Sequence, residues 1–273
     1  MIKEEFKTWL NNQYRYSDKT KKTYLQQLKH LDLNNLESNL LKLRSTKSDK
    51  TFNLIIVALR AFSRFLRQEY PKNNLISKID QLESIRSPRA EPHKPYNQEE
   101  VRKILNAAKG WRRVALHIAL YAGLRQQEIQ SLDLQDIDLE NGIITVRSGK
   151  GGKRREVAIS NILKAELERW IQLRNLQDSN SESLLISNRG SRPNLQSGSV
   201  LQILSQNVGF KVSWHRCRST YATMLYKKSK DVKLVQFQLG HSNSSTTDRY
   251  IQRSLSVIKE QINQIGDIYE RKQ

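Results

Sequence analysis

At 273 residues the chain is long enough for two domains, and its 37% hydrophobic and 27% charged residues exclude a disordered protein. Lysine and arginine outnumber aspartate and glutamate by 47 to 27, with 18 against 9 in residues 1–90 and 29 against 18 in the remainder, so we expect a polyanionic partner such as nucleic acid. The longest apolar stretch, residues 114–124, is too short to span a bilayer, and the N-terminus lacks an apolar signal region. The single cysteine excludes an internal disulfide. We therefore expect a cytoplasmic, nucleoid-associated protein and no membrane contact.

Residues 1–84 show the apolar spacing of a small helical bundle. One-face helical spacing recurs in four segments, whose apolar positions begin at Ile2, Tyr24, Phe52 and Leu75. The third and longest of these predicted helices carries Arg60, Arg64 and Arg67 in a basic stripe. A stripe of this kind is often only a solvated helix face. Because the whole chain is basic, we favour DNA phosphate contact by this stripe.

Residues 85–96 read as a linker, since they contain three prolines and no apolar period. Asn97 and Glu100 then have the spacing of a capping box that opens a helix. Further helices are predicted over residues 114–122, 126–132, 162–176, 195–206, 215–228 and 232–239.

Only one region is clearly of β type. Residues 143–147 and 155–159 flank a glycine-rich tip, residues 148–153, and this pattern predicts a hairpin. Residues 184–187 are predicted to add a short strand. We therefore expect a fold that is mainly α with a small antiparallel β-sheet (α+β), built as a two-domain DNA clamp with a second domain over residues 97–273.

Several side chains suit attack on a phosphodiester, whose negative charge must be neutralised before a nucleophile can approach. Arg125 follows a glycine that can end a helix, and Arg218 lies three residues after His215 on one helix face. Glu128, three residues after Arg125, could orient that arginine or be an exposed helical residue. Taken alone, such short strings are usually structural.

The remaining candidates lie on predicted loops. Lys150 at the hairpin tip could protonate a leaving hydroxyl, Lys153 competes for that role, and either could be a solubilising turn residue. His241 follows Gly240, a probable helix C-cap, and Tyr250 is one of ten tyrosines. The histidines lack metal-ligand spacing and one cysteine cannot build a zinc cluster, so no metal and no cofactor are predicted.

The ordered set of motifs resembles the tyrosine recombinase (phage integrase) family. The resemblance rests on Gly-Leu-Arg-x-x-Glu at 123–128, Gly-Lys-Gly at 149–151, His-x-x-Arg at 215–218 and Leu-Gly-His at 239–241, with Tyr250 nine residues after His241. It covers roughly residues 97–252, and residues 1–84 resemble the family's core-binding domain more vaguely. Cys217, Ser219 and Trp214 depart from the family pattern without removing a catalytic group. The length resembles that of a compact, Xer-like or minimal integrase.

The resemblance implies roles for these residues. Arg125, Arg218 and His241 would bind the scissile phosphate, His215 would assist Tyr250 or the phosphate, and Lys150 would be the general acid for the departing 5′-hydroxyl. Tyr250 would form a covalent 3′-phosphotyrosyl link to DNA without metal or ATP. The alternatives are a type IB topoisomerase-like enzyme, which nicks and re-seals one duplex, and a DNA-binding protein without activity.

An amphipathic helix is predicted near the C-terminus, about residues 254–273. Its apolar residues alternate spacings of three and four: Leu255, Ile258, Ile262, Ile265 and Tyr269. Such a helix could pack on its own domain. In the resembled family it docks on a neighbouring protomer, which implies a homotetramer on double-stranded DNA.

Overall fold

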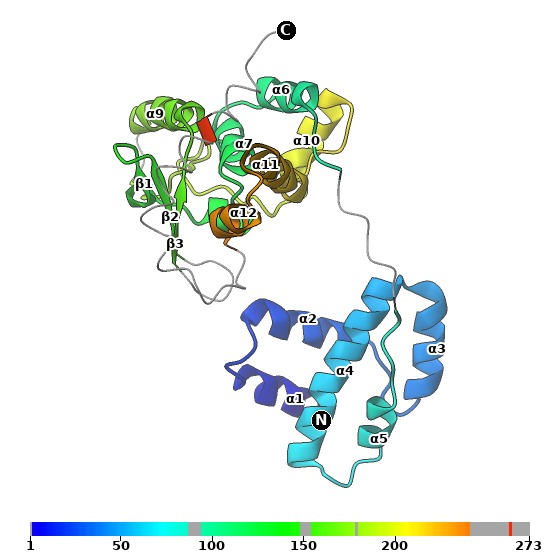
Figure 1. Cartoon of the computed structure of the whole chain (residues 1–273). Helices are drawn as coiled ribbons and strands as arrows, with labels where there is room; N and C mark the ends of the chain where they lie inside the picture. The colour runs from blue at the N-terminus through cyan, green and yellow to red at the C-terminus, as the bar shows by residue number, and fades with distance from the viewer. Residues whose placement is uncertain (1, 87–93, 148–153, 178–179, 241–261, 264–273) are drawn as a thin grey trace. The chain divides into compact units, whose positions relative to one another are not determined.

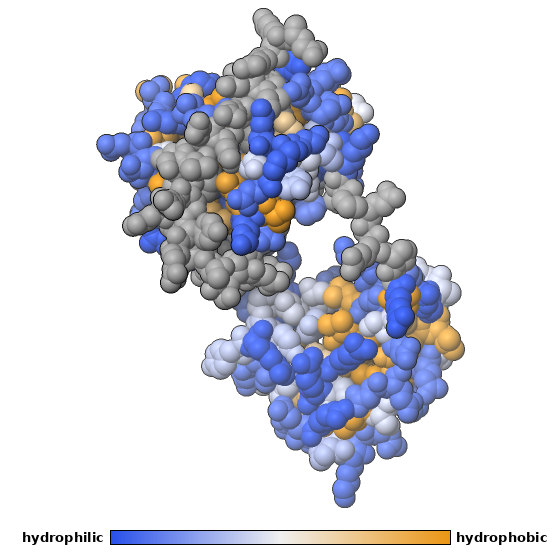
Figure 2. Space-filling view, in the orientation of Figure 1, coloured by the Kyte–Doolittle hydropathy of each residue, from blue (hydrophilic) through white to orange (hydrophobic). Residues whose placement is uncertain are grey.

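The computed structural model describes residues 2–86, 94–147, 154–177, 180–240 and 262–263. The chain forms two compact units, Met1–Glu91 and Pro92–Gln273 (Figure 1). On the face shown in Figure 2, hydrophilic residues cover much of the described surface of each unit, interrupted by groups of hydrophobic ones. No helix in the described ranges is both long and apolar enough to cross a membrane.

The N-terminal unit is a helical bundle. Its described helices are α1 (Ile2–Asn11), α2 (Asp18–Lys29), α3 (Leu36–Thr46), α4 (Asp49–Glu69) and α5 (Leu75–Asp80). Ser17 and Ser48 cap α2 and α4, because each side chain accepts a hydrogen bond from the backbone N–H three residues later. The long helix α4 buries its apolar face, where Phe62 and Phe65 contact the ring of Phe6 in α1 at centroid distances of 5.1 and 5.6 Å.

The apolar spacing does not predict α3. This helix buries only Leu36 and Leu40, which lie one turn apart, while the neighbouring Leu41 is 74% exposed. A single buried residue per turn gives a weak periodic signal, and an exposed leucine weakens it further. The helix is stabilised by its packing on α4, and this contact cannot be recognised from the spacing of apolar residues within residues 36–46 alone.

Arg60, Arg64 and Arg67 all lie exposed on α4 and make contacts within the unit. Arg60 Nη2 donates to the carbonyl oxygen of Leu82 at 3.0 Å, and Arg67 pairs with Asp80. The guanidinium of Arg64 lies 6.0 Å from the ring centroid of Tyr16. DNA contact by this stripe stays a prediction.

Changing these three arginines to alanine tests that contact. Each phosphate contact releases counterions, so the triple variant should lower the slope of log affinity against log salt by about 3. The measurement is DNA affinity by fluorescence anisotropy between low and moderate salt. An unchanged slope would contradict the prediction.

The C-terminal unit is mainly helical around a small sheet. Its described helices are α6 (Gln98–Ala107), α7 (Trp111–Tyr121), α8 (Gln126–Gln130), α9 (Asn161–Asn175), α10 (Ser199–Val208), α11 (Trp214–Ser229) and α12 (Val232–Leu239), with a 3₁₀ turn over Leu134–Asp136. The strands β1 (Ile137–Asp138), β2 (Ile143–Val146) and β3 (Arg155–Ala158) form an antiparallel sheet in the order β1-β2-β3. The predicted fold class, mainly α with a small antiparallel sheet, is confirmed.

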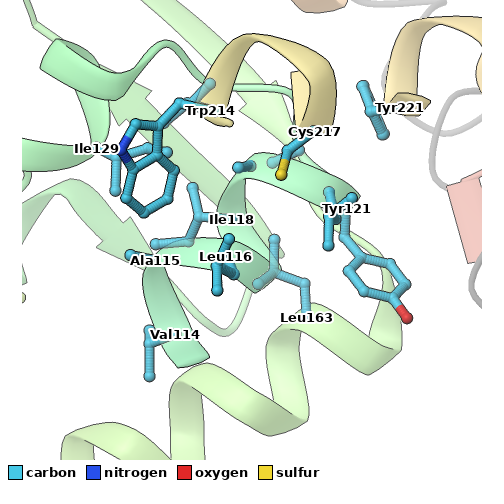
Figure 3. Packing of buried hydrophobic residues seen from close by; sticks show 14 of the residues in the cluster. Val114, Ala115, Leu116, Ile118, Tyr121, Ile129, Leu163, Trp214, Cys217 and Tyr221 are labelled. Atoms are coloured by element: carbon cyan, nitrogen blue, oxygen red, sulfur yellow. The ribbon is translucent and has the colours of Figure 1, made fainter. Parts of the chain in front are cut away.

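Helix α7 lies at the centre of this unit, and every residue from Val114 to Tyr121 is buried. Helices α9 and α11 pack against it (Figure 1). Figure 3 shows Cys217 of α11 among the buried residues of α7 and α9. Because α11 is fixed in a close-packed core, the charged residues on the same helix have a defined position.

The segment before α6 is attached to α11. The backbone N–H of Tyr96 donates to Thr220 Oγ1 at 2.8 Å, and its hydroxyl donates to the carbonyl oxygen of Lys211 at 3.0 Å. The guanidinium of Arg216 lies 3.9 Å from the Tyr96 ring centroid and its Nη2 donates to Glu100 Oε1 at 3.1 Å. These contacts fix α11 from the side of α6.

The predicted strand over residues 184–187 is wrong. Only Ser183 forms an isolated bridge, with Asp133, and residues 184–187 pair with no neighbouring strand. The apolar residues there are buried, which explains the strand-like pattern, but side chains of α9 take the backbone acceptors. Trp170 Nε1 donates to the carbonyl oxygen of Leu184 at 2.8 Å, and Arg174 Nε donates to that of Ser183 at 2.9 Å.

Candidate active site

Arg125 lies at a turn between two helices of the core. Gly123, between α7 and α8, has φ +67°, and a Cβ there would lie 2.4 Å from Cδ1 of Tyr221. Only glycine permits this close approach of the turn to α11. Arg125 then precedes α8, and its side chain is 30% exposed. The turn therefore presents this arginine at the edge of the core.

Glu128 of α8 binds Arg125 twice. The backbone N–H of Arg125 donates to Oε2 and its Nη1 donates to Oε1, both at 2.8 Å. The Glu128 side chain is only 3% exposed, so these bonds are shielded from water. The structure thus brings together this pair, for which the sequence left open an exposed glutamate.

Arg218 of α11 points to the same place. Its Nη1 donates to the carbonyl oxygen of Gly123, its Nη2 donates to that of Leu239 at 2.7 Å, and Nη1 lies 3.9 Å from Glu128 Oε2. Burial, and then the positive charge of Arg125, lower the pKa of Arg218 to about 10. The guanidinium is therefore still cationic at neutral pH.

A third arginine, Arg155 of β3, completes the cluster and was not predicted from the sequence. Its Nη1 and Nη2 donate to Oε1 and Oε2 of Glu128 at 2.9 and 2.8 Å, a two-pronged ion pair. The signal that could have found it is its register: Arg155 lies two residues before Val157 and therefore on the buried face of the strand. A charged residue at such a position needs a buried partner.

Four hydrogen bonds from arginine keep Glu128 ionised. Burial raises the pKa of its carboxyl, but the hydrogen bonds from Arg155 and Arg125 outweigh this effect and lower the pKa to about 2. Three guanidinium groups around one carboxylate leave a surplus of two positive charges. A site of this charge is suited to bind an anionic group such as a phosphodiester.

The other predicted residues have mixed outcomes. His215 is exposed in the first turn of α11, one turn before Arg218. Lys150, Lys153, His241 and Tyr250 lie outside the described residues. The residue before His241 reaches the cluster, because Arg125 Nη2 donates to the carbonyl oxygen of Gly240 at 3.5 Å.

No metal centre occurs in the described parts of the chain, where no three or more His, Cys, Asp or Glu side chains gather as ligands. His117 is buried in α7, its Nδ1 lies 2.9 Å from the carbonyl oxygen of Arg113, and burial lowers its pKa to about 4. It is therefore a neutral core residue. Cys217 is buried, which raises the pKa of its thiol to about 12 and makes it unreactive.

The chain is similar to known proteins in its sequence and in its fold. The model of the phage integrase family matches residues 95–256. The tyrosine recombinase XerA of Pyrococcus horikoshii is 33% identical over 229 residues, which cover 82% of this chain and 76% of that protein. The tyrosine recombinase XerC of Escherichia coli is 33% identical over 209 residues, covering 72% and 67%. A lambda integrase tetramer bound to a Holliday junction has a similar fold, with a TM-score of 0.68 at 18% identity over 90% of this chain and 78% of that one.

Proposed function

Since the chain belongs to the phage integrase family and is a site-specific tyrosine recombinase, an enzyme of DNA strand exchange, we propose that Tyr250 is its nucleophile and that the arginine cluster around Glu128 binds the scissile phosphate. Arg125 and Arg218 donate to the non-bridging phosphate oxygens, and His241 adds a further donor. The observation that carries this proposal is the surplus positive charge of the cluster, in which the buried carboxylate of Glu128 holds the arginine side chains in place. Guanidinium groups fixed before the substrate arrives stabilise developing negative charge without reorganisation.

The proposed reaction is a transesterification. The phenolic oxygen of Tyr250 forms a bond to phosphorus as the bond to the 5′-oxygen breaks, and the product is a 3′-phosphotyrosyl ester. The phenolic proton passes to His215, and Lys150 protonates the departing 5′-oxygen, with Lys153 as the second candidate. Because one phosphate ester replaces another, a second 5′-hydroxyl can reverse the step without ATP or a metal ion.

The relatives described above are recombinases, so a type IB topoisomerase-like activity and a DNA-binding protein without activity are not favoured. A trapping experiment tests the chemistry. The DNA is a duplex enriched from a random pool by binding to this chain, with a nick placed beside the cleavage point. The short fragment that carries the released 5′-hydroxyl then dissociates, so re-sealing is prevented and a covalent adduct accumulates. A chain that binds this DNA and forms no adduct would be a binding protein. Exchange between two duplexes distinguishes a recombinase from a topoisomerase.

We further propose a homotetramer on two DNA sites, supported by the tetrameric state of the lambda integrase structure. The predicted C-terminal helix would carry the contact between protomers through Leu255, Ile258 and Ile265. Ile262 was also predicted to take part, but it is 1% exposed in the core of its own unit and packs there instead. The adjacent Asn263 accepts a hydrogen bond from the backbone N–H of Asn161, at the start of α9, at 2.7 Å. A DNA-acting enzyme of this kind is proposed to work in the cytoplasm, at the nucleoid.

Removal of residues 264–273 tests the tetramer, because it deletes Ile265 while leaving the buried Ile262 and its neighbour Asn263 in place. We expect the affinity for a single DNA site to stay within about threefold of that of the full chain. The complex in which four protomers hold two DNA sites should be lost, since only the contact between protomers is removed. Native gels and analytical ultracentrifugation on DNA measure both quantities. A normal tetramer from the shortened chain would refute this contact.

A further inference from the structure

Arg155 occupies half of the hydrogen-bonding capacity of Glu128. An ionised carboxylate has about four acceptor sites. Arg155 fills two of them with its Nη1 and Nη2, and the backbone N–H and Nη1 of Arg125 fill the other two. Arg155 is therefore the only charged group that holds Glu128 from the side of the sheet, among the residues the structure describes.

Because the acceptor sites of Glu128 are filled, Arg218 makes its hydrogen bonds with other groups. Arg218 stands 3.9 Å from the carboxylate and donates instead to the carbonyl oxygens of Gly123 and Leu239. Without Arg155, two acceptor sites of a buried carboxylate would be open, and the nearest cations to fill them are Arg125 and Arg218. Either arginine would have to turn away from the phosphate to do so.

Arg155 also contacts the turn that precedes His241. Gly240 has φ +65°, and a Cβ there would lie 2.6 Å from Cδ and Nε of Arg155 and 2.9 Å from its Cζ. The Nε of Arg155 is buried without a hydrogen-bond partner among the described residues, and an unpaired buried donor is unfavourable. The arginine is thus held against Gly240 by packing, and its bonding geometry is set by Glu128.

On the basis of the proposed function, we infer that Arg155 is a positioning residue for DNA cleavage. It acts through Glu128 to keep Arg125 and Arg218 directed at the scissile phosphate, and through Gly240 to set the turn that leads to His241. Its place in β3 ties this arrangement to the hairpin that carries Lys150. The residue does not contact the reacting atoms.

The test compares Arg155→Lys and Arg155→Ala with the unaltered chain in single-turnover cleavage of the nicked duplex described above. Lysine keeps the charge but cannot make the two-pronged pair, and it supplies an answer if the alanine variant fails to fold. We expect adduct formation about 10²-fold slower for Arg155→Ala and about tenfold slower for Arg155→Lys, because displacement of the groups that bind the phosphate slows the chemical step by factors of this size. DNA affinity, measured in the Tyr250→Phe background, should change less than about threefold.

A second substrate separates positioning from a general loss of structure. A methylphosphonate at the scissile position carries no negative charge, so misdirected arginines matter less there. The rate of the unaltered chain divided by the rate of the variant should therefore be at least about tenfold smaller on the methylphosphonate than on the natural phosphodiester. Equal losses on both substrates, or variant rates equal to that of the unaltered chain, would overturn the inference. A failure of the unaltered chain to form any adduct would instead refute the proposed function.

Arg113→Ala is the matched control. Arg113 also binds a buried glutamate, with its Nε 3.1 Å from Glu166 Oε1, but this pair joins α7 to α9 outside the cluster. The control should lower the melting temperature as Arg155→Ala does. Its cleavage rate, measured well below both melting temperatures, should stay within about threefold of that of the unaltered chain, since this pair contacts neither Arg125 nor Arg218 in the described contacts. A control rate as low as that of Arg155→Ala would assign the effect to stability.

Discussion

Tyr250→Phe should form no covalent adduct with DNA while it still binds the site. The change removes one oxygen atom, the proposed nucleophile, and leaves the basic surfaces in place. Loss of a nucleophile lowers the rate by about 10⁶-fold, so the adduct should fall to background. Denaturing gels of the nicked-duplex reaction measure the adduct, and anisotropy measures the affinity, which should stay within about threefold.

Tyr226→Phe is the matched control for this change. Tyr226 is 46% exposed on α11, in the same unit as the cluster, and it belongs to no proposed step. It should give adduct at the rate of the unaltered chain. Adduct formed by the Tyr250→Phe variant would place the nucleophile elsewhere, and loss of adduct in both variants would mean that phenol removal acts through folding.

Arg218→Ala should reduce cleavage about 10³-fold, because it removes a phosphate ligand from a buried site where water cannot replace it. Arg218→Lys should recover little, since lysine cannot match the two donors that reach the carbonyl oxygens of Gly123 and Leu239. Affinity for DNA should fall less, by about tenfold at most, because the chain has 47 lysines and arginines and we expect many of them to contact the DNA phosphates. The ratio of these two losses is the measurement, taken from single-turnover rates and binding curves.

Arg216→Ala is the comparison for this prediction. Arg216 is on the same helix, two residues away, but its guanidinium binds Glu100 and the carbonyl oxygen of Lys94. Its loss should cost stability and leave the cleavage rate within about threefold, since it contacts α6 and not the cluster. Cleavage by Arg218→Ala at the rate of Arg216→Ala would show that Arg218 is not a phosphate ligand.

Local patterns predicted most helices well. Helices α4, α7 and α11 have long apolar periods, and the paired strands β2 and β3 lie on either side of a glycine-rich sequence. Where the pattern was short or its partners distant, prediction failed. The two-residue strand β1 leaves almost no signal. Residues 184–186 are buried without being a strand, and the side chains of Trp170 and Arg174 donate to the carbonyl oxygens of Leu184 and Ser183.

The sequence itself gives the order and spacing of six candidate residues, because they occur in short motifs: Arg125, Glu128, His215, Arg218, His241 and Tyr250. They were enough to predict a tyrosine recombinase, and the family match agrees. The contacts between these residues could not be predicted from the sequence. Packing of α7, α8, β3, α11 and α12 brings together four segments that are distant in the chain: residues 123–128, 155, 218 and 239–240.

The partner of Arg155 shows what the tertiary structure alone decided. From the sequence Arg155 is one basic residue beside another, with no helical or motif neighbour to mark it. Its role follows from a contact across 27 positions, in which strand register turns its side chain inward and the buried Glu128 demands a cation there. The sequence determined which chemical groups this protein has. Packing decided which carboxylate they share, because burial makes an unpaired charge too costly to leave alone.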